Sequence, residues 1–108
     1  MTLKYIETTV SRLKVKVAYL GHVKNILNDK REEQIEIQEG ASVADLLVEL
    51  SNEYGEPFKK AVYEKGGTDV KANFMATVNG CLLNQLEGVK TKLKQGDNVI
   101  IMSVVSGG

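Results

Sequence analysis

Two glycines at the end of the sequence, Gly107 and Gly108, have a type and a position that suggest chemistry. A terminal carboxylate is a poor electrophile because its leaving group would be oxide, so acyl chemistry there first requires a mixed anhydride, typically with AMP. We therefore expect an enzyme with an ATP site to take up this end through a narrow slot, which glycine enters without a side chain to obstruct it. Because glycine makes up about 7% of residues, chance alone gives the pair in roughly one chain in 200, so the signal is only suggestive.

Other residues give weaker chemical signals. Cys81 is the only cysteine, so no intrachain disulfide forms and we expect a reducing, cytoplasmic environment. It stands beside Leu82 and Leu83, and we interpret it as a small buried hydrophobic residue and not as a reactive thiol. The single histidine, His22, is expected on a connection without a catalytic role. With no phosphate-binding glycine-rich loop and no cluster of metal ligands in the sequence, we expect no bound cofactor and no metal.

Length and composition narrow the class of protein. The 108 residues suffice for one domain with a modest core, which argues against an enzyme that works alone. The hydrophobic fraction of 43% and the charged fraction of 26% are typical of a folded globular chain. Basic and acidic residues cancel to a formal net charge of zero, which argues against nucleic acid and anionic lipid as partners. We see no signal-peptide pattern and no apolar run near the ~20 residues of a membrane span, so no membrane association is expected.

The elements that must position the two glycines are mainly strands. Alternating apolar and polar residues predict strands at residues 13–19, 34–38 and 74–78. The first two form a hairpin with a long connection in this interpretation. Asn79-Gly80 is a tight-turn dipeptide, and a short strand over 81–83 should follow it. The β-branched apolar run at 99–105 predicts a buried, central strand that leads directly to the end of the chain.

One helix is clearly signalled between these strands. Ser42 and Asp45 resemble a capping box at its start, and an apolar face with helical spacing follows. That face consists of Val43, Leu46, Leu47, Leu50 and Tyr54. Gly55 and Pro57 are expected to end the helix, and residues 56–72 are expected to be irregular. The element order predicts an α+β fold, a ubiquitin-like β-grasp with a mixed sheet packed on one main helix. We divide the chain into an N-terminal extension (1–12), a β-grasp domain (13–105) and a flexible tail (106–108).

Several segments together carry a resemblance to a known family. They are residues 39–47 at the helix start, 78–80, 91–99 and 105–108. Over about residues 13–108 the chain resembles the small sulfur-carrier proteins of the MoaD and ThiS group, most closely the MoaD branch, the small subunits of molybdopterin synthase.

This resemblance implies a specific chemical cycle. An E1-like enzyme uses ATP to adenylate the Gly108 carboxylate, a sulfur donor displaces AMP, and a terminal thiocarboxylate forms, with Gly107 providing clearance for the tail. The thiocarboxylate then gives its sulfur to a molybdopterin precursor in a complex with the large subunit of molybdopterin synthase, which builds the dithiolene that holds molybdenum or tungsten. The chain would thus be a cosubstrate, the small subunit of that synthase, and not a self-sufficient enzyme.

Two alternatives stay open on the sequence. The first keeps the adenylation step and makes the chain a thiamine-type sulfur carrier or a ubiquitin-like protein modifier. The second makes it a non-catalytic β-grasp binding module whose glycines are incidental. Met75, Ile100 and Met102 would suit an apolar docking face for two enzymes, although we expect most of them in the core. Their exposure in the structure decides between a docking face and a place in the core.

Overall fold

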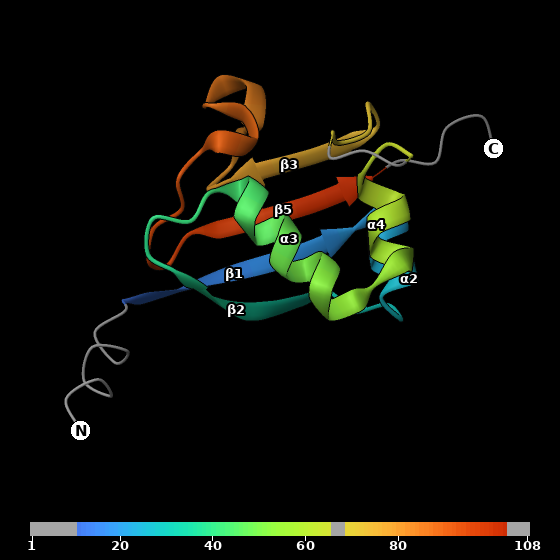
Figure 1. The fold of residues 1–108 in the computed structure, drawn as a ribbon, viewed down its shortest axis with the longest axis horizontal. Coiled ribbons are helices and arrows are strands. Elements are labelled where there is room, and N and C mark those ends of the chain that lie inside the picture. Colours follow the sequence, from blue (N-terminus) through green and yellow to red (C-terminus); the bar gives the residue numbers. More distant parts are fainter. Residues whose placement is uncertain (1–10, 66–68, 104–108) are drawn as a thin grey trace.

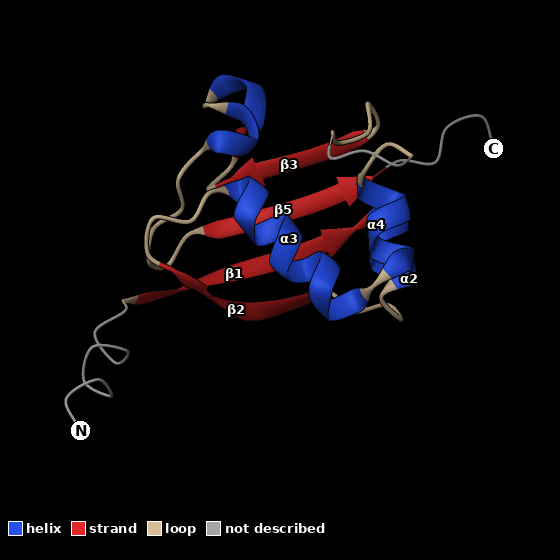
Figure 2. Ribbon diagram, viewed as in Figure 1, coloured by secondary structure: helices blue, strands red, loops and turns tan. Residues whose placement is uncertain are grey.

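The computed structural model describes residues 11–65 and 69–103. These residues form a five-stranded mixed sheet in the order β2-β1-β5-β3-β4, with one main helix crossing one face (Figures 1 and 2). The strands are β1 (Arg12–Leu20), β2 (Glu32–Gln38), β3 (Phe74–Val78), β4 (Cys81–Leu82) and β5 (Asn98–Ser103). The helices are α2 (Gly21–Ile26), α3 (Val43–Tyr54) and α4 (Glu56–Val62), with 3₁₀ turns η1 (Leu83–Gln85) and η2 (Gly88–Lys90). The predicted β-grasp architecture is confirmed.

Strand β5 occupies the centre of the sheet. It pairs in parallel with β1 and antiparallel with β3, so its backbone is hydrogen-bonded on both sides. Val99 and Ile101 point into the core and are 1% and 0% exposed. The central position predicted for this strand is therefore confirmed over 98–103. Residues 104–108, which include the rest of the predicted strand and the predicted tail, lie outside the described residues, as do residues 1–10 of the predicted extension.

Helix α3 begins and ends where the sequence predicts. The Ser42 hydroxyl accepts a hydrogen bond from the Asp45 backbone N–H at 3.3 Å, and the Asp45 carboxylate accepts one from the Ser42 N–H at 2.9 Å. This reciprocal pair satisfies two backbone donors at the start of the helix. Gly55, with φ of 77°, follows its last residue. The four aliphatic residues of the predicted apolar face are at most 1% exposed: Val43, Leu46, Leu47 and Leu50.

The prediction that residues 56–72 are irregular is wrong for residues 56–62, which form α4. Pro57 lies in the first turn of this helix, where its missing N–H has no partner to lose and its fixed φ suits the helix. The same proline that cannot continue α3 therefore helps to start α4. Phe58, Ala61 and Val62 are 0%, 6% and 0% exposed, so α4 is held by the core more than by local signals.

The connection between β1 and β2 contains a second helix that the sequence analysis missed. Helix α2 has six residues and no side-chain cap, and only Val23 in it is buried. A helix this short is stabilised by its contacts with β5 and α4, which no local pattern reveals. His22 therefore lies in a helix and not in a loop.

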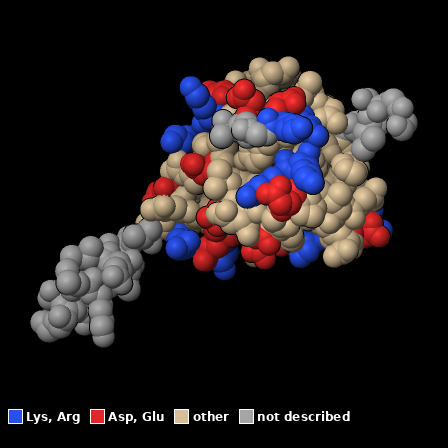
Figure 3. All heavy atoms as spheres, turned by 45° about the vertical axis from the view of Figure 1, so that its right-hand side comes forward, with Lys and Arg blue, Asp and Glu red and all other residues tan. Residues whose placement is uncertain are grey.

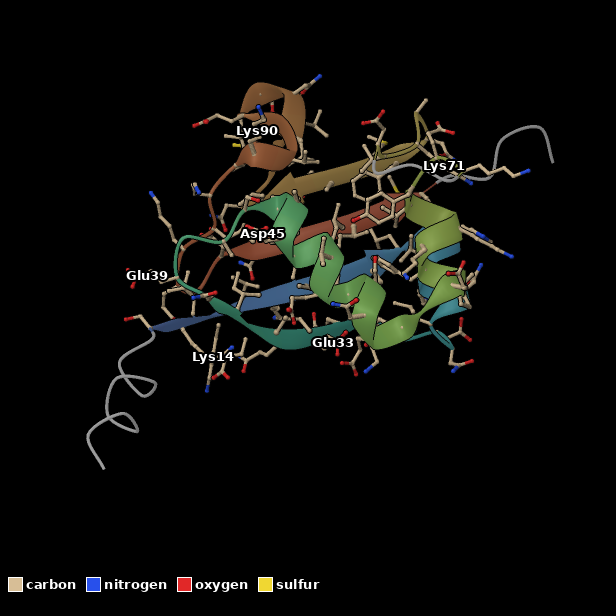
Figure 4. The ribbon with its side chains drawn as sticks, viewed as in Figure 1. Lys14, Glu33, Glu39, Asp45, Lys71 and Lys90 are labelled. Carbon is tan, nitrogen blue, oxygen red and sulfur yellow. The ribbon has the colours of Figure 1, made fainter. Side chains whose placement is uncertain are left out.

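A carboxylate bound by two hydroxyl groups links β1, β2 and α3. The Tyr19 hydroxyl donates to Glu33 Oε2 at 2.6 Å, and the Tyr54 hydroxyl donates to the same oxygen. The Lys30 ammonium lies 3.4 Å from Glu33 Oε1. Glu33 belongs to β2 and lies beside α3 (Figure 4). Burial alone raises the pKa of Glu33, but the hydrogen bonds from the two hydroxyls and the nearby ammonium outweigh it and hold the pKa below its ordinary value of 4.5.

We expect this carboxylate to make the fold sensitive to acid. A lowered pKa in the folded state contributes stability that is present above the unfolded pKa and is lost as the pH falls through the folded pKa. Glu33→Gln should lower the free energy of unfolding by about 1–3 kcal/mol at neutral pH, and the variant should lose less stability than the wild type on acidification. Urea unfolding at pH 7 and at about pH 3 measures both effects, with the exposed Glu49→Gln as the control. An unchanged acid dependence in Glu33→Gln would contradict the prediction.

Candidate functional site

The end of β5 is paired with a neighbouring segment along each of its two edges. Ser103, the last described residue of this strand, pairs with Phe74 of β3. On the other side, Gly21 forms a parallel bridge with Ser103, which extends the β1–β5 pairing by one residue. This end of the strand lies where α2 and α4 cover the sheet (Figure 1). The chain therefore leaves Ser103 from a position set by two neighbouring strands.

Gly21 is required here by both conformation and space. Its φ is +64°, a left-handed conformation that side chains disfavour. A Cβ at this position would lie 2.7 Å from the Ser103 carbonyl oxygen and 3.3 Å from Met102 Cγ. The sequence analysis missed this residue, although a glycine directly after a strand was a signal that could have pointed to it. Gly21 allows the start of α2 to approach the end of β5.

We expect Gly21→Ala to be more destabilising than the same change at Gly88. Gly88 has nearly the same φ, +62°, but a Cβ there would meet nothing within 4 Å. Gly88→Ala should cost about 1–2 kcal/mol for the left-handed backbone alone. Gly21→Ala should cost roughly 1–3 kcal/mol more, because the Ser103 carbonyl must move. Chemical denaturation of the two variants measures the difference, and equal losses would show that the contact with Ser103 is unimportant.

One face of the sheet is left uncovered by the helices. Paired residues on neighbouring strands point to the same face, so the register defines two cross-strand rows there. The first row contains Leu20, Met102 and Met75. The second row contains Ala18, Ile100, Thr77 and Leu82. We call these seven residues the outer sheet face, and α3 crosses the opposite face (Figure 1).

The outer sheet face is apolar except for Thr77, and four of its seven residues are exposed. Leu20 is 45% exposed, Met75 41%, and Ile100 and Leu82 are each 37% exposed. The expectation that Met75 and Ile100 belong to the core is therefore wrong, because they alternate with the inward residues Ala76 and Ile101 on strands of which one face has no cover. Grouped apolar side chains at a protein surface are typical of interaction sites.

Cys81 is also exposed, contrary to the prediction that it is buried. It stands at the edge of the sheet in β4, a strand of only two residues that follows the tight turn. Apolar neighbours in sequence do not bury a residue at such an edge, and Leu82 is exposed as well. The turn itself agrees with prediction, since Asn79 and Gly80 have φ of 52° and 87°.

The two residues predicted to react, Gly107 and Gly108, lie outside the described residues. The structure describes the strand before them, β5, as far as Ser103. Within residues 11–65 and 69–103, no three His, Cys, Asp or Glu side chains group closely enough to hold a metal ion. No helix in the same ranges is long and apolar enough to cross a membrane. Basic and acidic side chains are interspersed over the surface shown in Figure 3.

Comparison with known proteins identifies the family. The sequence matches the ThiS family over residues 17–108. No curated protein sequence matches the chain.

Several solved structures are similar to this chain. A Pyrococcus furiosus protein described as a candidate subunit 1 of molybdopterin converting factor is 31% identical, with a TM-score of 0.65, over 86% of this chain and 99% of that one. The small archaeal modifier protein 1 of Methanosarcina acetivorans is 24% identical, with a TM-score of 0.73, over 91% of this chain and 99% of that one. A chain in the BexX/CysO complex of Amycolatopsis orientalis is 17% identical, with a TM-score of 0.66, over 87% of this chain and 99% of that one.

The family match covers most of the sequence, and the fold found here agrees with these structures. The chain therefore belongs to the ThiS family, with the ubiquitin-like β-grasp fold of sulfur carriers and protein modifiers.

Proposed function

We propose that this protein carries sulfur for molybdopterin biosynthesis on the carboxyl group of Gly108. The observation that carries the proposal is the position of β5, a central strand held on both sides up to Ser103, from which the chain continues toward the two glycines. The similarity to the Pyrococcus furiosus protein described as a candidate subunit 1 of molybdopterin converting factor favours the molybdopterin branch. The seven residues of the outer sheet face offer an apolar surface for partner enzymes.

The chemistry uses an ATP site that belongs to an E1-like partner. An oxygen of the Gly108 carboxylate attacks the α-phosphorus of ATP, pyrophosphate leaves, and an acyl adenylate forms. A sulfur donor then displaces AMP and leaves a thiocarboxylate on Gly108, while Gly107 keeps the approach to the site free of a side chain. The ionised sulfur is a nucleophile, so it can attack a carbon of the molybdopterin precursor held by the large subunit of the synthase, with an oxygen group of the precursor as the leaving group. Water then hydrolyses the resulting thioester, which leaves the sulfur on the precursor and restores the Gly108 carboxylate. In this cycle the protein supplies the reacting atom and its partners supply the binding sites.

The surface of the carrier must fit two enzymes in turn. Met75 and Met102 on the outer sheet face have flexible, polarizable side chains that adapt to different partners. An exposed apolar face beside the end of β5 would let either enzyme hold the domain while the residues after Ser103 enter its site. The free cysteine of this chain, Cys81, suits the reducing cytoplasm.

The proposal is tested by reconstituting the cycle with the full chain. Incubation with an E1-like enzyme, ATP and a sulfur donor should raise the intact mass by the difference between sulfur and oxygen, and fragmentation should place this change on Gly108. The product should then form molybdopterin with the large synthase subunit and the precursor, and omission of ATP should prevent both steps. Isopeptide-linked conjugates in place of sulfur transfer would favour a protein modifier, and transfer only into a thiazole would favour a thiamine-type carrier. Unchanged mass with the cognate enzymes would contradict the proposal.

A further inference from the structure

A pocket of about 520 Å³ lies at the end of the sheet where β5 ends. Its wall combines residues from four places in the chain, which are His22 of α2, Lys60 of α4, Lys71 and Asn73 before β3, and Ser103 of β5. Figure 4 shows Lys71 at this end of the molecule. None of these residues belongs to the outer sheet face, so the pocket is a separate surface.

The described residues that line the pocket have positive or neutral side chains only. Among the described residues, neither Lys60 nor Lys71 forms an ion pair, whereas the adjacent Lys59 is paired with Glu56 at 3.9 Å. Lys60 and Lys71 both line this pocket, and positive side chains that lie near each other attract an anion. The carboxylates of Glu56 and Glu64 line an adjoining pocket that shares these two lysines, so the positive excess is confined to the side of His22 and Ser103. Because the formal net charge of the whole chain is zero, the fold and not the composition produces this local excess.

Ser103 adds a polar group that has no partner. Its side chain is 1% exposed, and its Oγ makes no hydrogen bond in the described part of the chain. A buried hydroxyl without an acceptor costs free energy, and the oxygen of an anion would supply that acceptor. Every second side chain of β5 points into the core, and the other two inward residues, Val99 and Ile101, are aliphatic. Ser103 therefore places a hydroxyl donor among apolar side chains.

We propose that this pocket binds one tetrahedral oxyanion of the phosphate class. Lysine ammonium groups act as point charges that bind phosphate well, and two lysines in one pocket suit the multiple charge of a phosphate better than the single charge of a carboxylate. A concave site with a buried donor suits a small ligand better than the flat surface of a protein. The same chemistry has two sources, free inorganic phosphate and the phosphate of AMP, the by-product of the activation proposed above. Only the AMP source rests on that proposed function.

Titration of the ¹⁵N-labelled full chain tests the proposal without any partner enzyme. Potassium phosphate, exchanged against potassium chloride at constant ionic strength, should cause saturable shifts of the backbone amides of His22, Lys60, Lys71 and Ser103. A parallel series with AMP separates the two sources, because tighter binding of AMP identifies the nucleotide and equal or weaker binding identifies free phosphate. A glutamate-rich peptide serves as the third probe.

Variants assign the binding to the pocket. The double variant Lys60→Ala/Lys71→Ala should weaken phosphate binding roughly tenfold or more, since each charge-assisted contact contributes to affinity. The matched control Lys14→Ala/Lys90→Ala removes two lysines at the opposite end of the molecule and should leave the affinity within about twofold (Figure 4). Ser103→Ala keeps both charges and removes only the buried oxygen, and it should weaken binding several-fold while circular dichroism stays unchanged.

Three results would overturn the proposal. The first is a shift that never saturates, and the second is an equal loss in the control double variant, since either one indicates only general attraction between lysines and anions. The third is saturable binding of the glutamate-rich peptide without binding of phosphate, which would make the pocket a docking patch for acidic proteins. Unchanged affinity in Ser103→Ala would contradict the part of the proposal in which the Ser103 hydroxyl binds the anion.

Discussion

Deletion of Gly107 and Gly108 is expected to abolish ATP-dependent thiocarboxylate formation and to leave the stability of the fold unchanged. The deletion moves the terminal carboxylate back to Ser106, so the reacting group is displaced by two residues and a side chain stands at the end of the chain. Misplacement of a reacting group by even a small distance is costly in an enzyme site, on the order of a hundredfold for 1 Å. The loss of two glycines, by contrast, removes no side chain and so little apolar area, and among the described residues the buried core already extends from Val15 to Ile101.

Mass spectrometry of the reconstituted reaction and thermal unfolding measure the two halves of this prediction. Gly107→Ala is the graded variant, because it keeps the length and adds only a Cβ, and it should lower kcat/KM without abolishing the reaction. A deleted chain that still gains sulfur would show that the glycines are incidental, as in a β-grasp binding module. A large drop in unfolding temperature would show that the deletion acts through the fold.

A charge in the middle of the outer sheet face is expected to prevent recognition by the activating enzyme. Ile100 lies on the central strand between Ala18 and Thr77 and is 37% exposed. In Ile100→Asp, docking would bury an unpaired carboxylate, so we expect KM for the carrier to rise roughly 30-fold or more, as at an interface hot spot. The free energy of unfolding should fall by about 1–2 kcal/mol, because the side chain is 37% exposed and loses part of its apolar contact in addition to strand propensity.

Val48→Asp provides the matched control for this experiment. Val48 is also an exposed aliphatic residue, 51% exposed, but it lies on α3, which covers the other face of the sheet. Its replacement should leave KM near the wild-type value. Steady-state kinetics of adenylation, with pyrophosphate release as the signal, distinguishes the two variants. Equal effects of both changes, or an unaffected Ile100→Asp, would rule out the outer sheet face as the docking surface.

Local chemistry was enough to predict most of the fold. The exchange of hydrogen bonds between Ser42 and Asp45 involves residues three positions apart, and the apolar face of α3 repeats within the same twelve residues. Alternation located β1, β2 and β3, and the glycine of the Asn79-Gly80 turn accepts the positive φ found there. The order of these elements then predicted the β-grasp and the central place of β5.

Errors arose where tertiary contacts decide. Helix α4 and the short α2 depend on burial of Phe58 and Val23 in the core, against elements such as α3 and β5, and the exposure of Cys81 depends on its place at the edge of the sheet. A pattern of neighbouring residues in the sequence does not predict such contacts between distant parts of the chain. It also cannot tell which face of a strand is covered when both faces are apolar, as at Ile100 and Ile101.

The sequence by itself determined the elements, their order and the candidate chemistry at Gly107 and Gly108. Only the tertiary structure decided how the domain would present them. It placed Gly21 against Ser103, left the outer sheet face uncovered, and brought Lys60 and Lys71 to one pocket. The physical reason is range, since capping, alternation and turn formation act between near neighbours in sequence, whereas close approach, exposure and charge clustering arise between residues that meet only in the folded chain.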